Sequence, residues 1–168
     1  MSLANYIPHQ APMRLVDTLL SSSPLEVEVE AHILADNIFY DASRGGVPAW
    51  TGIEYMAQAA AVWVGIEDTR LSKPIEPAFL ISSRQYTAHC PLFALGEPLR
   101  IRVHADLVDG PLVAFRGTIH NRTGLLAEAI FTAYRPDDIA AYMAATEPQT
   151  LSAASPLSQS KKTQGVTP

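Results

Sequence analysis

The stretch that decides the fold is residues 48–65, which read PAWTGIEYMAQAAAVWVG. After its first residue this stretch contains no proline, and it consists mainly of apolar residues, small residues and good helix formers. The pattern predicts a helix over about residues 50–69 that is buried on most of its surface. Its many small side chains would allow other backbone segments to approach closely.

Segments on both sides of this helix have the pattern of strands. Residues 25–33, LEVEVEAHI, alternate apolar and polar side chains, which is the period-2 pattern of a strand with one face in water. Four further apolar, β-branched and aromatic segments follow the helix, at 78–88, 98–106, 112–120 and 125–134. Turn signals separate the later segments, as in an antiparallel meander. One long apolar helix and then a run of strands predicts an α+β domain, with a curved antiparallel sheet wrapped around the helix.

The length of 168 residues fits one domain with a substantial core. Because 48% of the residues are hydrophobic and 17% are charged, the chain has the composition of a folded protein. Residues 146–168 are rich in Ser, Thr, Gln, Ala and Pro and lack apolar periodicity. We therefore expect one domain over residues 1–145, with a short helix at 137–144, and a disordered tail over 146–168.

The charge and the single cysteine limit the classes of partner. A net charge of −5, with no long run of Lys and Arg, argues against nucleic acid or an anionic membrane as the main partner. No stretch approaches the ~20 apolar residues of a membrane span, and no leader pattern opens the sequence. The one cysteine, Cys90, cannot form an intrachain disulfide, and no clustered ligands indicate a metal site. We expect a cytoplasmic protein that binds small molecules or other proteins.

Glu54 is the residue of the expected helix that most needs an explanation. It lies near the start of an otherwise almost uncharged segment. A carboxylate in the first turn complements the helix dipole, which is the simpler interpretation. The alternative is a general acid or base in an apolar site, where burial raises the pKa of a carboxyl group.

Two motifs resemble those of a known family. Residues 52–59, GIEYMAQA, resemble the start of the central helix of 3-hydroxyacyl-[acyl-carrier-protein] dehydratases, which reads roughly L-E-A-M-A-Q-A. Residues 7–17, IPHQAPMRLVD, resemble the opening segment of that family, roughly L-P-H-R-x-P-x-L-L-V-D. Together with the expected strands, the resemblance extends from about Tyr6 to Arg135. The chain is also similar to a dehydratase-like subgroup associated with aryl polyene clusters.

The resemblance implies a hot-dog fold, a dimer, and an active site in a tunnel at the subunit interface. The implied reaction removes water from a 3-hydroxyacyl thioester in fatty-acid or polyene-type biosynthesis. The substrate is carried on the phosphopantetheine of an acyl carrier protein, so the chain needs no cofactor of its own. The implied partners are that carrier protein and, as homodimer or heterodimer, a second hot-dog dehydratase.

The resemblance also implies site residues. Glu54 would be the catalytic carboxyl group, and backbone N–H groups at the helix start would hold the enolate-like oxygen of the substrate. We expect the substrate to contact Ala49, Trp50, Thr51, Gly52 and Gln58.

The sequence departs from the family at the catalytic histidine of the loop before the helix. Counting back from Glu54 places Tyr40 at that position, and no histidine occurs between His32 and His89. Three interpretations follow. The chain could be a dehydratase that combines Glu54 with Tyr40, His9 or His89, a non-catalytic or weakly active subunit that stabilises a catalytic hot-dog partner, or an acyl thioesterase. For His9, which lies in a rigid Pro-rich segment, a structural role is the simpler alternative to a catalytic one.

Overall fold

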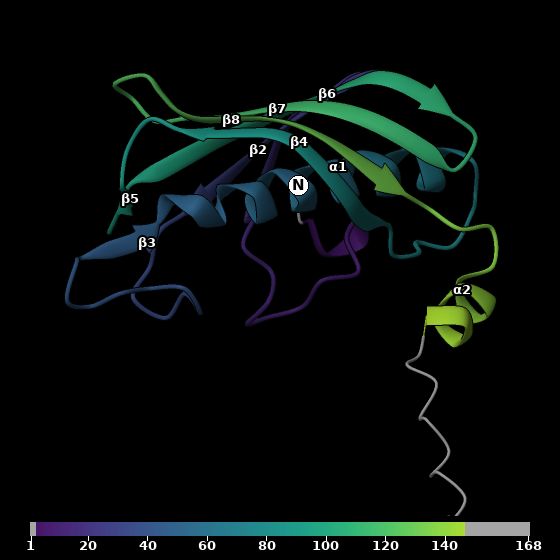
Figure 1. Ribbon diagram of the computed structural model, residues 1–168, viewed down its shortest axis with the longest axis horizontal. Coiled ribbons are helices and arrows are strands. Elements are labelled where there is room, and N and C mark those ends of the chain that lie inside the picture. Colours follow the sequence, from purple (N-terminus) through teal and green to yellow (C-terminus); the bar gives the residue numbers. More distant parts are fainter. Residues whose placement is uncertain (1–2, 147–168) are drawn as a thin grey trace, which may run out of the picture.

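A six-stranded antiparallel sheet curves over one long helix in the computed structural model, which describes residues 3–146 (Figure 1). Helix α1 spans Gly52–Arg70 and follows a 3-10 turn, η2, at Ala49–Thr51. The sheet has the strand order β1-β2-β6-β7-β8-β4. Its strands are Thr18–Ser22 (β1), Glu26–His32 (β2), Phe79–Ala88 (β4), Pro98–Asp109 (β6), Leu112–His120 (β7) and Leu125–Tyr134 (β8). This arrangement is the α+β hot-dog fold expected from the sequence.

Three shorter elements complete the described chain. A two-stranded sheet pairs β3 (Gly46–Pro48) with β5 (Leu92–Ala94) beside the start of α1. A 3-10 turn, η1, lies at Leu3–Asn5, and helix α2 spans Ile139–Thr146, close to the expected 137–144. Within residues 3–146 no helix is long and apolar enough to cross a membrane. Apart from Thr146, the expected tail lies outside the described residues.

Strand β2 shows why the period-2 prediction holds. Val27, Val29 and Ala31 are fully buried against the helix, while the intervening glutamates face outward. On the outer face Glu28 accepts a hydrogen bond from Arg102 of the neighbouring strand β6, at 3.1 Å. One face of β2 is therefore core and the other is solvated.

The order of the strands differs from the expected meander. Strands β6, β7 and β8 follow one another as antiparallel neighbours, but β4 pairs with β8 rather than with β6. Strand β6 also runs to Asp109, beyond the expected end at residue 106. Strands β1, β3 and β5 were not predicted because they are only three to five residues long and carry little periodic pattern.

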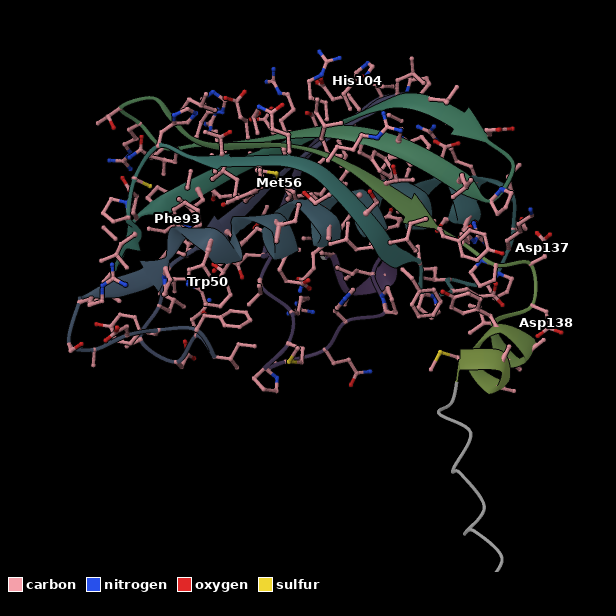
Figure 2. The ribbon with its side chains drawn as sticks, viewed as in Figure 1. Trp50, Met56, Phe93, His104, Asp137 and Asp138 are labelled. Atoms are coloured by element: carbon pink, nitrogen blue, oxygen red, sulfur yellow. The ribbon has the colours of Figure 1, made fainter. Side chains whose placement is uncertain are left out.

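Helix α1 is covered on two opposite sides. Met56 points toward the sheet (Figure 2), where Gly117 of β7 leaves room for it: a Cβ at residue 117 would lie 2.7 Å from its sulfur. On the other side the N-terminal segment crosses the helix, and Gly65 lies so close to the backbone of Tyr6 that no Cβ fits there. The small residues of α1 therefore permit the close approach that the sequence predicted.

Strand β4 forms one edge of the sheet. Among the described residues it pairs with β8 alone. Its apolar side chains Leu80 and Ile81 are 41% and 49% exposed. A long edge strand with exposed apolar side chains presents unpaired backbone groups on which another strand can form.

Candidate functional site

Glu54 occupies the first turn of α1 and is half-buried. Its Oε1 accepts a hydrogen bond from Nε2 of Gln58, one turn further along, at 2.9 Å. Gln58 is fully buried; its Nε2 also donates to the Met13 carbonyl and its Oε1 accepts from the Leu15 N–H, both at 2.8 Å. Gln58 thus joins the N-terminal segment to the carboxylate. It holds Glu54 Oε1 as an acceptor and leaves Oε2 outside this network.

Glu54 shares a small cavity with His9. The cavity has a volume of about 90 Å³, and its other walls are mainly apolar. Those walls are Ala57, Ala60, Ala61, Val64, Ala78, Leu80, Phe115, Phe131 and Ala133. Nδ1 of His9 is buried and has no hydrogen-bond partner among the described residues. The fold thus brings together two titratable groups that lie 45 positions apart in the sequence.

The other two candidate partners of Glu54 lie elsewhere. Tyr40 is half-buried in the loop before β3; it does not line the cavity, and within residues 3–146 no hydrogen bond joins it to Glu54. His89 lies on the surface, where its Nε2 is 3.1 Å from Glu128 Oε1. Of the three groups considered from the sequence, only His9 faces the same space as Glu54.

The turn before α1 uses some of the backbone donors that were expected to hold the substrate. The Ala49 N–H donates to the Pro91 carbonyl at 3.1 Å, and the Gly52 N–H donates to the Ala49 carbonyl. The Thr51 hydroxyl donates a hydrogen bond to the Pro48 carbonyl at 2.8 Å. Trp50 is 65% exposed and points away from the sheet (Figure 2). The N–H groups of Ala49 and Gly52 are therefore already bonded within the chain.

Two tyrosines, the half-buried Tyr86 and the fully buried Tyr55, lie near this turn, and the sequence analysis singled out neither. The Tyr86 hydroxyl, from β4, donates to the Ala49 carbonyl and lies against Gly52, where a Cβ would collide with it. The Tyr55 hydroxyl accepts a hydrogen bond from Asn37 Nδ2 at 2.9 Å. Burial raises the pKa of each tyrosine to about 12, so both stay neutral near physiological pH. Tyr55 lies within the quoted motif at 52–59, but the contacts of both tyrosines could not be predicted because they join segments distant in the sequence.

Comparison with known proteins places this geometry in a family. The model of the ApeP-like family, described as ApeP dehydratase, matches residues 1–144. The chain belongs to the ApeP-like dehydratase family. A search of curated proteins found no significant match.

One solved structure agrees with this assignment to the ApeP-like family, and others share the fold. The dehydratase heterocomplex ApeI:P from Xenorhabdus doucetiae contains a chain 25% identical to this one; the match covers 88% of this chain and 99% of that chain, with a TM-score of 0.80. The uncharacterised protein PH1136 from Pyrococcus horikoshii is 14% identical over 82% of this chain and 96% of its own, with a TM-score of 0.60. The PaaI protein of E. coli is 13% identical over 70% of this chain and 82% of its own, with a TM-score of 0.55. The last two matches show a shared fold only.

Proposed function

We propose that this chain takes part in the dehydration of 3-hydroxyacyl thioesters carried on an acyl carrier protein, as one subunit of a hot-dog complex. In this proposal Glu54 is the catalytic carboxyl group. The observation that carries it is the cavity in which Glu54 meets His9, walled by apolar side chains and by edge strand β4.

The reaction needs two proton transfers, and the cavity holds two groups able to make them. A base takes the proton from the carbon beside the thioester carbonyl, an acid protonates the departing 3-hydroxyl group, and a carbon–carbon double bond forms as water leaves. His9 suits the first step, because an imidazole nitrogen can accept a proton and its buried Nδ1 has no hydrogen-bond partner within residues 3–146. Glu54 suits the second step in its protonated form: Gln58 Nε2 donates to Oε1, and the proton on Oε2 passes to the departing hydroxyl group, which leaves Glu54 as a carboxylate and His9 as an imidazolium.

A second subunit is part of the proposal because the cavity is too small for the substrate. Its volume of about 90 Å³ falls well below the roughly 300–1,000 Å³ of small-molecule sites. Leu80 of β4 belongs both to the cavity wall and to the exposed edge of the sheet. A strand from another hot-dog subunit added to this edge would reshape the wall beside Glu54. The ApeI:P structure, a dehydratase heterocomplex, supports such pairing.

A second candidate function is a subunit that stabilises a catalytic hot-dog partner without contributing to the chemistry. It is favoured by Tyr40, which occupies the position of the family's loop histidine and lies away from the Glu54 cavity. The two functions differ in one respect, which is whether the complex needs Glu54.

The test measures dehydration of a 3-hydroxyacyl carrier protein by the chain alone, by a catalytic hot-dog dehydratase alone, and by their mixture. In the mixture we expect Glu54→Gln to lower the rate on the order of 10²–10⁴-fold, as loss of a general acid does. The matched control is Glu26→Gln, a glutamate on the outer face of β2, which should leave the rate unchanged.

Each outcome decides between the candidates. His9→Gln should lower the rate as much as Glu54→Gln if His9 is the base, and much less if the partner supplies the base. Full activity of the Glu54→Gln mixture would refute the catalytic proposal and support the stabilising subunit. Release of a free acid that depends on Glu54 would replace dehydration with thioesterase activity.

A further inference from the structure

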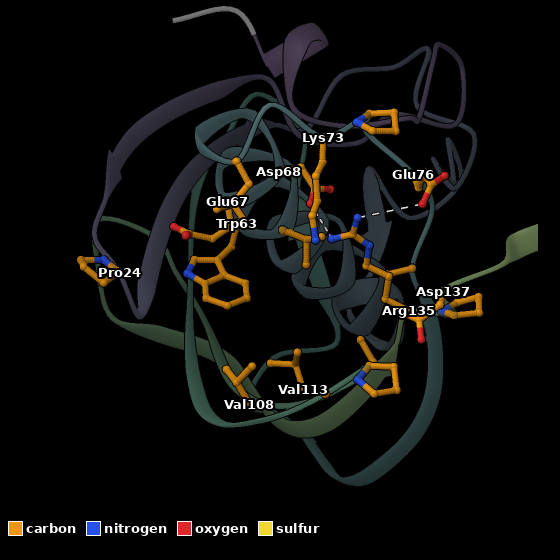
Figure 3. A pocket seen from close by; sticks show the side chains of 18 of the residues that line it. Pro24, Trp63, Glu67, Asp68, Lys73, Glu76, Val108, Val113, Arg135 and Asp137 are labelled. Atoms are coloured by element: carbon orange, nitrogen blue, oxygen red, sulfur yellow. Dashed lines mark hydrogen bonds and ion pairs between the residues drawn. The ribbon is translucent and has the colours of Figure 1, made fainter.

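Polar side chains from outside helix α1 contact both of its ends. At the last turns Asp68 lines a cavity of about 600 Å³, and its Oδ1 pairs at 2.5 Å with Nη1 of Arg135, the residue after β8 (Figure 3). At the start of the helix the contact comes from edge strand β4, where the Tyr86 hydroxyl donates to the Ala49 carbonyl. This second contact lies at the end of the helix that carries Glu54.

The Ala49 carbonyl accepts two hydrogen bonds. One comes from the Gly52 N–H, at the end of the 3-10 turn η2, and the other comes from the Tyr86 hydroxyl. Because a backbone carbonyl oxygen has two lone pairs, these two bonds use its full capacity. Glycine at residue 52 permits the arrangement, since a Cβ there would collide with the Tyr86 hydroxyl. The carbonyl is therefore fixed in direction by two donors from different parts of the chain.

The direction of the Ala49 carbonyl also sets the direction of the Trp50 N–H. The two groups belong to the same planar trans peptide unit, in which they point in opposite directions. The first N–H groups of a helix have no intrahelical partner, and the Trp50 N–H has no hydrogen bond within residues 3–146. Tyr86 therefore orients a backbone donor that the described chain does not itself use.

The Trp50 N–H and Glu54 are close enough to act on one short segment of substrate. Four residues at a rise of 1.5 Å separate the two by about 6 Å along the helix axis. Loss of the proton beside the thioester carbonyl places negative charge on the thioester oxygen, and the positive end of the helix dipole favours such a charge. A backbone donor whose direction is fixed in advance stabilises this charge more than one that must reorient during the reaction.

We propose that Tyr86 is a positioning residue for the dehydration: by holding the Ala49 carbonyl, its hydroxyl aims the Trp50 N–H at the thioester oxygen of the substrate. This inference rests on the proposed function, because it needs the substrate beside Glu54. Tyr86 itself touches no reacting atom. Burial raises its pKa to about 12, so the hydroxyl keeps the proton that it donates to the Ala49 carbonyl.

The first test measures kcat and KM for a 3-hydroxyacyl carrier protein with the chain mixed with a catalytic hot-dog dehydratase. Tyr86→Phe removes only the hydroxyl. We expect kcat per folded complex to fall about tenfold, less than the roughly 10²–10³-fold loss when such a donor is removed outright. KM should change less than about twofold, because the donor acts on charge that exists only in the transition state. The matched control is Tyr55→Phe, which loses a hydrogen bond to Asn37 and should keep the wild-type kcat.

A second test observes the thioester carbonyl directly and requires no turnover. The probe is the N-acetylcysteamine thioester of a 2-enoic acid, the product form, labelled with carbon-13 at the carbonyl and bound to the complex. A hydrogen bond to a carbonyl group lowers its stretching frequency in the infrared spectrum. We expect the bound band to lie below that of the free probe in the wild type and in Tyr55→Phe, and to return toward the free value in Tyr86→Phe.

A double-mutant cycle shows whether Tyr86 acts through the turn. In Gly52→Ala the new methyl group displaces the Tyr86 hydroxyl, so this variant should also lower kcat. Adding Tyr86→Phe to Gly52→Ala should lower kcat no further, because both changes remove the same contact. Independent effects would instead multiply. The cycle keeps the test decisive if one variant is less stable than the wild type.

An unchanged kcat in Tyr86→Phe would overturn the inference, and so would equal falls in Tyr86→Phe and Tyr55→Phe. A wild-type carbonyl band at the frequency of the free probe would also overturn it. If Glu54→Gln lowers the rate while Tyr86→Phe leaves both the rate and the band unchanged, only this inference fails. If Glu54→Gln leaves the rate unchanged, the proposed function fails, whatever Tyr86→Phe does to the band.

Discussion

The two ends of helix α1 hold two carboxylates in different surroundings. At the first turn Glu54 faces a cavity of about 90 Å³ and is bonded to the neutral amide of Gln58. At the last turns Asp68 lies beside a cavity of about 600 Å³ and is paired with the charged Arg135. The same helix thus holds one of these two carboxylates through a neutral donor and the other through an ion pair.

Because of this difference, we expect the two ends of the helix to contribute unequally to the stability of the fold. Glu54 is held by one hydrogen bond from a neutral amide, so the loss of that donor leaves no buried charge without its counter-charge. A buried ion pair requires both charges, because removing one partner leaves the other uncompensated. Mutations at the Asp68 end should therefore affect folding most, and those at the Glu54 end should affect folding less.

The largest effect on stability is expected from Arg135→Ala. The variant leaves the Asp68 carboxylate, which is 1% exposed, without its cation, and we expect the free energy of unfolding to fall by about 3–5 kcal/mol. Urea denaturation at neutral pH measures the loss. The control is Arg116→Ala, which removes an arginine 65% exposed from its pair with Asp106 and should cost at most about 1 kcal/mol. Equal losses in the two variants would remove the distinction between the ends of the helix.

A smaller loss is expected from Gln58→Leu at the Glu54 end. The change removes the partners of the Leu15 N–H and the Met13 carbonyl, and we expect it to cost roughly 2–3 kcal/mol, since each unsatisfied buried group is worth about 1–3 kcal/mol. Gln10→Leu, at an exposed position, is the control and should be nearly neutral. A Gln58→Leu variant as stable as the wild type would show that the amide network does not anchor the N-terminal segment.

The smallest effect is alkaline destabilisation at the Glu54 end. Burial raises the pKa of Tyr55 to about 12 in the folded chain, above the value of about 10 for an exposed tyrosine. The folded state therefore keeps a proton that the unfolded state loses, so this contribution is complete below pH 10 and is lost as the pH rises through about 12. At pH 11 we expect Tyr55 to account for a loss of about 1 kcal/mol. Urea denaturation measures the fall in the free energy of unfolding between pH 9 and pH 11, and this fall should be smaller in Tyr55→Phe than in the wild type. An equal fall in the two proteins would contradict the raised pKa of Tyr55.

Much of the fold could be predicted from local patterns. The small and apolar residues of α1 predicted a buried helix because such a composition is stable only when it is covered on most sides. The alternation in β2 predicted a strand with one wet face, since successive side chains of a strand point to opposite faces. Strand order could not be predicted in this way. Strand β4 is the first strand after the helix, yet it pairs with β8, the last strand in the sequence.

The candidate site was only partly predictable, for a related reason. Glu54 was identified because it is the only charged residue between Gly52 and Ile66, which is visible in the sequence itself. The sequence left His9, Tyr40 and His89 open as its partners, and the structure places only His9 in the same cavity. Tyr86 was missed because its role depends on a contact with a turn 37 residues away.

The amino-acid sequence by itself determined the class of fold, the position of the central helix and the presence of an acidic group near its start, because these depend on side-chain periodicity over a few turns. The tertiary structure alone decided which groups face Glu54, that β4 lies at the edge of the sheet, and that Asp68 pairs with Arg135. These features depend on how distant segments cross in space, and no local periodicity encodes that crossing.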